Sequence, residues 1–266
     1  MRSMRLDAAL VERGVAVSRE RAKEIILTGD VAVNGLVIRK PAKIIEETDR
    51  IDRSGSGDKT YVGRGYIKLE KALDSFHINV TGMHCLDVGA STGGFTQLLL
   101  ARGAAKVTAV DVGSGQLAQV LRDDQRVVSM EKTDIRKVTR EIIGEVLFAC
   151  VDVSFISLKL VLEPVFALLN EAGSAVCLLK PQFEAGPRRA GKRGVVKDPE
   201  VHVKVINEAL ICARKTGFSV CAMTHSPIRG GEGNLEYLVY LHKNGQNGNL
   251  PDPRQIVQAA WKELVG

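Results

Sequence analysis

Four charged residues next to strongly apolar segments could together move a proton. Asp152 and Lys180 each end an apolar run, Lys68 precedes the first central strand, and Glu236 opens the last one. Ligands of open α/β sheets bind at the carboxyl ends of the strands, so we expect these side chains beside a ligand. A lysine serves as a base only where burial or a second cation disfavours its charged form. Taken singly, each residue is better explained as a salt bridge at a strand end.

A glycine-rich turn follows the apolar strand that begins at Cys85. Gly89 and Gly93 interrupt the chain, and the segment from Phe95 to Ala101 has the pattern of a helix. A buried strand, a glycine-rich turn and a helix form the first unit of a nucleotide-binding α/β fold. Asp111 lies 22 positions after Gly89, where an acid can accept hydrogen bonds from both hydroxyls of a ribose.

The turn favours S-adenosylmethionine over a dinucleotide. Ser91 stands where the dinucleotide fingerprint has the glycine that makes room for a pyrophosphate. S-adenosylmethionine has a ribose and an adenine but no phosphate, and Asp134 could place a carboxylate near the adenine amino group. A structural turn without a ligand is the alternative. The predicted cofactor residues are Asp87, Gly89, Ala90, Ser91, Gly93, Gly94, Phe95, Asp111 and Asp134.

Composition and charge narrow the class of protein. The 266 residues are 45% hydrophobic and 26% charged, as in an ordinary globular protein, and the net charge of +6 favours an anionic partner. No apolar run approaches the ~20 residues of a membrane helix, and the N-terminus has no apolar signal region, so we expect a cytoplasmic protein without a membrane partner. The five cysteines and five histidines show no ligand spacing, so we expect neither disulfides nor a metal.

Two helices and a hairpin are expected in the first fifty residues: helices from Arg5 to Arg13 and from Ser18, and a hairpin over 31–38 with an Asn34-Gly35 turn. With these elements, residues 4 to about 53 resemble the small S-four RNA-binding domain, named after a ribosomal protein. Residues 1–62 carry twelve basic and ten acidic side chains, so any RNA affinity depends on clustering on one face. A solvated charged domain is the alternative. The RNA-binding candidates here are Arg5, Arg19, Arg21 and Lys23.

The Gly/Ser stretch 54–58 predicts a linker, so we expect domains at 1–58 and 59–266. In the second domain apolar strands alternate with helical segments, including 66–73, 115–121, 158–169, 199–216 and 253–265. This alternation predicts a Rossmann-like α/β sheet, preceded by a small α+β domain. The family resemblance described next implies that this sheet is of the kind found in class I S-adenosylmethionine-dependent methyltransferases.

Lys68, Asp152, Lys180 and Glu236 match the Lys-Asp-Lys-Glu set of the FtsJ-like ribose 2′-O-methyltransferases. With the S-four-like domain in front, the segments 64–65, 152–157, 180–184 and 233–236 resemble the TlyA family over nearly the whole chain. The resemblance implies S-adenosylmethionine-dependent methylation of cytidine riboses in ribosomal RNA of assembled subunits. Some members carry a haemolysin label, for which the sequence offers no spanning segment.

A basic segment completes the set of RNA-binding candidates. Residues 180–197 carry six basic side chains and one acid, which suits phosphate contacts but also a plain solvated loop. The further candidates are Arg64, Arg188, Arg189, Lys192 and Arg193. A nicotinamide-dependent oxidoreductase and a non-catalytic RNA-binding or haemolysin-like protein remain as alternatives. The sequence leaves the methylated nucleotide and the oligomeric state open.

Overall fold

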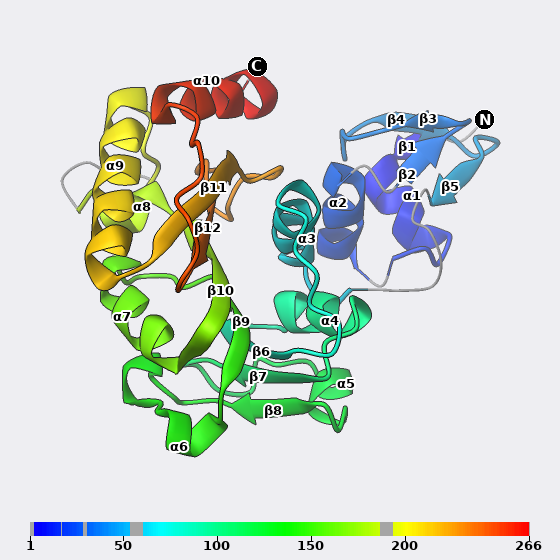
Figure 1. The fold of residues 1–266 in the computed structure, drawn as a ribbon. Coiled ribbons are helices and arrows are strands. Elements are labelled where there is room, and N and C mark those ends of the chain that lie inside the picture. Colours follow the sequence, from blue (N-terminus) through cyan, green and yellow to red (C-terminus); the bar gives the residue numbers. More distant parts are fainter. Residues whose placement is uncertain (1–2, 17, 29–30, 54–60, 187–193, 266) are drawn as a thin grey trace. The chain divides into compact units, whose positions relative to one another are not determined.

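The computed structural model describes residues 3–16, 18–28, 31–53, 61–186 and 194–265 (Figure 1). The chain divides into two compact units, residues 1–60 and residues 61–266. Each unit has a hydrophobic core of its own and is described separately.

The first unit is a small α+β fold. Its elements are β1 (Ser3–Arg5), α1 (Leu6–Glu12), α2 (Arg19–Thr28), β2 (Val31–Val33), β3 (Leu36–Val37), β4 (Ile44–Glu46) and β5 (Ile51–Arg53). Strands β2 and β3 form the expected hairpin, in which Asn34 and Gly35 have φ of 52° and 81°. Positive φ at both central residues is what a two-residue hairpin turn requires. Strands β1, β4 and β5 were not predicted: each has three residues, as β2 has, but no Asn-Gly turn marks them in the sequence.

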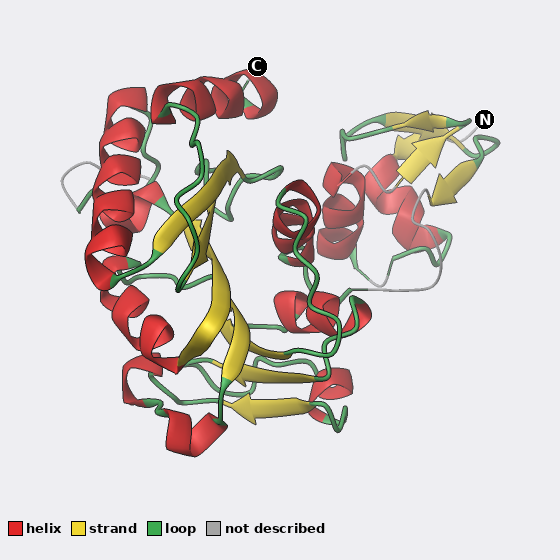
Figure 2. Ribbon diagram, viewed as in Figure 1, coloured by secondary structure: helices red, strands yellow, loops and turns green. Residues whose placement is uncertain are grey.

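The second unit is built on one seven-stranded sheet (Figure 2). Its strands are β6 (His84–Val88), β7 (Lys106–Val110), β8 (Val127–Met130), β9 (Val146–Val151), β10 (Leu169–Leu179), β11 (Ser219–His225) and β12 (Tyr237–His242). The order across the sheet is β11-β12-β10-β9-β6-β7-β8. Strands β6 to β10 are parallel, and β12 runs antiparallel to both of its neighbours. The predicted α/β fold with a mostly parallel sheet is confirmed.

Helices cover both faces of this sheet. They are α3 (Tyr66–Ser75), α4 (Gly94–Ala101), α5 (Gln119–Arg122), η1 (Ile135–Lys137), α6 (Arg140–Ile143), α7 (Lys159–Leu168), α8 (Pro181–Glu184), α9 (Pro199–Thr216) and α10 (Pro253–Leu264). Two neighbouring residues of β9 belong to different cores: Phe148 packs with residues of α3 and α4, and Ala149 with residues of α7, α9 and α10. In Figure 1, α3 and α4 lie on one side of the sheet, and α7 and α9 on the other. Because both faces are buried, the central strands are mostly apolar, and Asp87 of β6 and Thr108 of β7 are buried polar exceptions.

The segment predicted as a helix over 115–121 is mostly a loop. The Glu131 carboxylate accepts hydrogen bonds from the backbone amides of Gly115, Gln116 and Leu117, and these bonds hold the pKa of Glu131 below its usual value. These bonds hold residues 115–117 around the carboxylate in a loop, and α5 begins only at Gln119. The Glu131 carboxylate comes from fourteen residues beyond Leu117, and no local sequence pattern indicates this contact.

Four parallel strands end side by side and bring the predicted site residues to one edge. Val88 of β6 is paired with both Val110 of β7 and Val151 of β9, and Val151 is paired with Cys177 of β10. The residues that follow these strands therefore gather at the carboxyl edge of the sheet. The chain order reverses between β6 and β9, which is where open α/β sheets bind ligands.

Candidate active site

The four charged residues meet in one cluster. Lys180 Nζ lies 2.5 Å from Asp152 Oδ1, and Lys68 Nζ lies 2.7 Å from Glu236 Oε2 and 3.9 Å from Asp152 Oδ2. Both lysine side chains are 9% exposed, Glu236 is 3% and Asp152 19% exposed. Asp152 is thus the most open member and lies between the two lysines. We call these residues the tetrad.

Each tetrad residue comes from a different element of the scaffold. Lys68 lies in the first turn of α3, Asp152 follows β9, Lys180 follows β10, and Glu236 directly precedes β12. The backbone of Asp152 passes so close to Gly89 that a side chain there would meet the Asp152 carbonyl oxygen at 2.5 Å. Gly89 also has a φ of 85°, so a glycine is needed both for space and for conformation.

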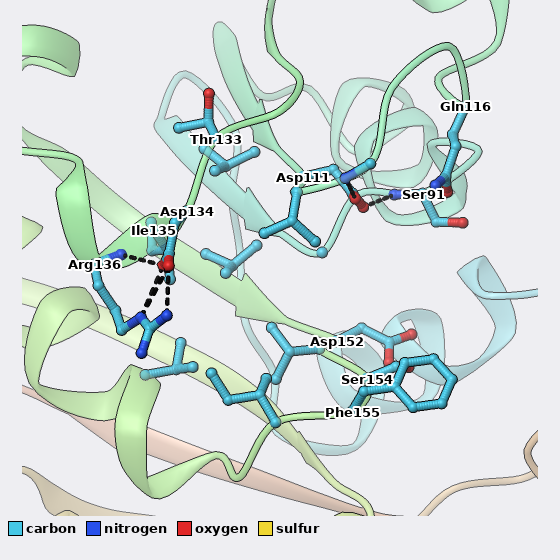
Figure 3. A pocket seen from close by; sticks show the side chains of 18 residues that line it. Ser91, Asp111, Gln116, Thr133, Asp134, Ile135, Arg136, Asp152, Ser154 and Phe155 are labelled. Atoms are coloured by element: carbon cyan, nitrogen blue, oxygen red, sulfur yellow. Dashed lines mark hydrogen bonds and ion pairs between the residues drawn. The ribbon is translucent and has the colours of Figure 1, made fainter.

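A pocket of about 530 Å³ adjoins the tetrad and shares Asp152 with it (Figure 3). Its walls come from the segments that follow β6, β7, β8 and β9, including Gly89, Ser91, Asp111 and Asp134. This volume lies within the range of small-molecule and cofactor sites.

Asp111 is oriented by the backbone. Its Oδ2 accepts from the Ser91 amide at 2.8 Å and its Oδ1 accepts from the Gly113 amide at 2.7 Å. Each carboxylate oxygen has a second lone pair, so the group can still accept a hydrogen bond at either oxygen. Figure 3 shows Asp111 and Ser91 together on one side of the pocket and Asp134 on another.

Asp134 also lines the pocket, but it is already paired. It accepts from the Arg136 amide and from the Arg136 guanidinium, whose Nη2 lies 2.6 Å from Oδ2. These bonds lower the pKa of Asp134 to about 2. A ligand that uses this carboxylate has to share it with Arg136.

Five residues of the predicted cofactor set do not line this pocket: Asp87, Ala90, Gly93, Gly94 and Phe95. Asp87 is fully buried, with Oδ2 accepting from Thr96 Oγ1 at 2.7 Å, and burial raises its pKa to about 7. A side chain at Gly93 would meet Leu121 Cδ1 at 2.2 Å. All five residues are buried, so they support the glycine-rich turn from the protein interior and do not form the pocket surface.

Two aromatic side chains were missed from the sequence. Phe155 is 91% exposed and lines the pocket, and its ring lies 5.2 Å from that of Phe183 in α8. Phe183 in turn lies 5.9 Å from Lys180 Nζ. Phe155 has a φ of 65°, which is rare for a bulky residue and costs free energy unless its surroundings hold it. An aromatic residue next to apolar residues in the sequence gives no indication that its ring will be exposed at a pocket.

The RNA-binding candidates are only partly described. Asp7 is fully buried and accepts from Arg5 Nε at 3.0 Å, from Arg5 Nη2 at 2.8 Å and from Arg19 Nη2 at 3.3 Å. Both arginine side chains remain about half exposed, at 45% and 54%. Lys23 is exposed on α2, and Arg64 is half-buried before α3. Arg188, Arg189, Lys192, Arg193 and the side chain of Arg21 lie outside the described residues.

Two family models match the chain: FtsJ-like methyltransferase over residues 61–243, and the S4 domain, the S-four domain above, over residues 4–51. A Bacillus subtilis protein named "Putative rRNA methyltransferase YqxC" is 43% identical over 98% of this chain and 95% of its own length. The "16S/23S rRNA (cytidine-2'-O)-methyltransferase TlyA" of Mycobacterium tuberculosis is 44% identical over 90% of each chain.

A solved structure titled "Putative hemolysin from Streptococcus thermophilus" matches with a TM-score of 0.74 and 40% identity, over 99% of this chain and 97% of that one. None of the described helices combines the length and apolarity needed to span a bilayer. The family match decides between the reaction classes left open by the glycine-rich turn, in favour of methyl transfer over hydride transfer. The chain belongs to the TlyA family of FtsJ-like methyltransferases, with an S4 domain in front of the methyltransferase domain.

Proposed function

We propose that this protein methylates the 2′-hydroxyl of cytidine riboses in ribosomal RNA of assembled subunits, using S-adenosylmethionine. The names of its relatives support this substrate. The observation that carries the proposal is Asp152, which belongs at once to the tetrad and to the wall of the pocket. A cofactor in that pocket and a hydroxyl at the tetrad would therefore be neighbours.

The pocket residues fit S-adenosylmethionine. Asp111 offers the two carboxylate oxygens that a ribose diol needs, and Ser91 and Gly113 fix their direction. Asp134, shared with Arg136, would accept from the adenine amino group, as the sequence suggested. When bound, the cofactor supplies an electrophilic methyl group. The chain supplies orientation of the two reactants, an effect that can amount to many kcal/mol.

The tetrad can take up the hydroxyl proton and keep its charges balanced. Lys180 is the proposed base, because it is 9% exposed, shares Asp152 with a second cation, Lys68, and lies beside the pocket wall that Asp152 forms. It accepts the hydroxyl proton only in its neutral form, which the Asp152 carboxylate opposes, so Asp152 itself does not activate the base. Asp152 then keeps Lys68, 3.9 Å away, as a counter-ion, and Glu236 holds Lys68 in place. When Lys180 gains the proton, its ammonium again faces Asp152. We assign Asp152, Lys68 and Glu236 to orientation and charge balance.

The exposed aromatics suit a nucleotide substrate. Phe155 lines the pocket and is 91% exposed, and the Phe183 ring centre lies 5.9 Å from Lys180 Nζ. Bases taken out of a stack bind on aromatic side chains, each worth about 1–3 kcal/mol. We propose that the base of the target nucleotide rests on Phe155 while its ribose reaches Lys180.

The S4 domain is the proposed RNA-recognition unit. Arg5 and Arg19 share the buried Asp7, so part of each guanidinium is fixed while the rest stays exposed. Arginines held in this way lose less conformational freedom on gripping a phosphate. Lys23, Arg64 and the basic side chains of 188–193 complete the proposed contacts.

The test is methyl transfer from labelled S-adenosylmethionine to purified ribosomal subunits, followed by mapping of the methylated riboses. Wild-type protein should label RNA at cytidine 2′-oxygens, and Lys180→Arg should not, because a guanidinium does not release its proton at working pH. Transfer to a base atom, or full activity of Lys180→Arg, would refute the assignment. Free RNA and separate subunits, compared in parallel, test the substrate's state of assembly.

A further inference from the structure

Glu184 joins two segments that carry the proposed active site. Its Oε1 accepts from the Leu158 amide at 2.6 Å, and its Oε2 accepts from Ser157 Oγ at 2.7 Å. Glu184 is the last residue of α8, the helix that begins directly after Lys180. Ser157 and Leu158 end the loop that begins at Asp152. The carboxylate therefore closes a ring between the segment 180–184 and the loop 152–158.

The start of the loop 152–158 is held by Lys180, and its end is held by Glu184. Lys180 Nζ contacts Asp152 Oδ1 at 2.5 Å and donates to Ser154 Oγ at 2.9 Å. Phe155 follows with its φ of 65°. A bulky residue in this conformation persists only when the structure on both sides holds it. On the far side, the hydrogen bonds from Ser157 and Leu158 to Glu184 provide that hold.

Glu184 does more here than a local helix cap. The start of α7 already has a local contact, since Ser157 Oγ accepts from the Lys159 amide at 3.2 Å. The carboxylate comes from 26 residues further along the chain, and it reaches Ser157 and Leu158 together. A carboxylate at a helix N-terminus is favourable in its own right, which strengthens the tie between the two segments.

We propose that Glu184 is a positioning residue, which fixes the loop 152–158 against α8. It thereby holds Lys180, Ser154 and Phe155 in the positions that the reaction requires. This inference rests on the function proposed above. It predicts that loss of the carboxylate loosens the loop without unfolding the domain. A displacement of about 1 Å in a reacting group can slow catalysis about 100-fold.

Three variants test the proposal. Glu184→Ala removes both bonds. Glu184→Gln keeps an oxygen for the Leu158 amide and gains an amide that donates to Ser157 Oγ. Glu200→Ala is the matched control, because Glu200 is also a helix-end carboxylate, but its 2.5 Å ion pair is with Arg254. We expect single-turnover methyl transfer to ribosomal subunits to fall about 10- to 100-fold in Glu184→Ala, and to stay within about threefold of wild type in the other two.

Hydrogen exchange of the full-length protein gives a readout independent of activity. Amides of 154–158 should exchange faster in Glu184→Ala and at the wild-type rate in Glu184→Gln and Glu200→Ala, while the β6, β9 and β10 amides stay protected in all three. Faster exchange throughout the sheet would reduce Glu184 to a stabilising residue and overturn the proposal. A wild-type rate with a wild-type exchange pattern in Glu184→Ala would also overturn it. If wild-type protein transfers no methyl group to RNA, the proposed function fails, and the exchange pattern still decides whether Glu184 holds the loop.

Discussion

Asp152 is shared by two lysines, so we predict that two substitutions which break the same Asp152–Lys180 ion pair will lower the free energy of unfolding by different amounts. Asp152→Asn keeps the side-chain shape and removes the charge, so Lys180, 9% exposed, loses its carboxylate partner and retains the Ser154 hydroxyl. Lys180→Met keeps the apolar stem and removes the cation, but Asp152 still has Lys68 at 3.9 Å. Asp152→Asn should therefore destabilise the protein more than Lys180→Met.

The magnitudes follow from burial and distance. Removing one partner of a buried pair costs about 3–5 kcal/mol when the other is left uncompensated, and we expect this for Asp152→Asn. In Lys180→Met the remaining pair at 3.9 Å retains a gross attraction of about 4 kcal/mol at an effective dielectric constant near 20. We therefore expect a cost of roughly 1–3 kcal/mol, as for an ordinary substitution. The double variant should cost less than the two single ones together.

Urea unfolding at pH 7 measures these differences. The single tryptophan, Trp261, lies in α10 with its ring 4.6 Å from that of His202, so its fluorescence reports on the methyltransferase unit. Equal costs for the two substitutions, or a larger cost for Lys180→Met, would mean that Lys68 does not compensate Asp152. The tetrad would then be two separate pairs and not a shared set.

Three further predictions concern the cofactor, the buried acid and the RNA. Asp111→Asn should weaken S-adenosylmethionine by about 1–3 kcal/mol in calorimetry, the cost of unpaired hydrogen-bonding groups, and unchanged affinity would remove Asp111 from the site. Burial raises the pKa of Asp87 from 3.8 to about 7, so the folded protein loses stability relative to the unfolded chain as pH rises through that window. The free energy of unfolding of Asp87→Asn should therefore gain up to about 4 kcal/mol over that of wild type between about pH 4 and pH 8, and a pH-independent difference would contradict this. Replacing Arg5 and Arg19 by Gln should reduce the salt dependence of RNA binding by about two charges, and an unchanged slope would place both arginines away from phosphate.

Much of the architecture could be predicted because the central strands are mostly apolar runs, and three of them are followed by a charged residue. Asp111, Asp152 and Lys180 mark three strand ends, and the parallel sheet brings such ends together whatever the loops do. The hairpin turn at Asn34-Gly35 was equally readable, since few dipeptides accept its conformation. These features depend on local pattern alone.

What the sequence did not reveal depends on contacts between distant segments. Glu184 reaches a loop 26 residues earlier, and Glu131 bonds the amides of the loop 115–117, where a helix was expected. Asp87 stands in the glycine-rich segment yet bonds Thr96 inside the core, because the alternation of the strand turns it away from the pocket. Exposure, as at Phe155, emerges only once the fold is assembled.

The most direct test of the central claim is a map of ribose methylation in ribosomal RNA from cells that lack this protein, restored with the wild-type or with the Lys180→Ala variant. We predict that at least one cytidine 2′-O-methyl group is absent without the protein, returns with wild type, and stays absent with Lys180→Ala at equal protein level. Equal methylation of ribosomal RNA in all of these cells would contradict the account, and restoration by Lys180→Ala would exclude Lys180 as the base.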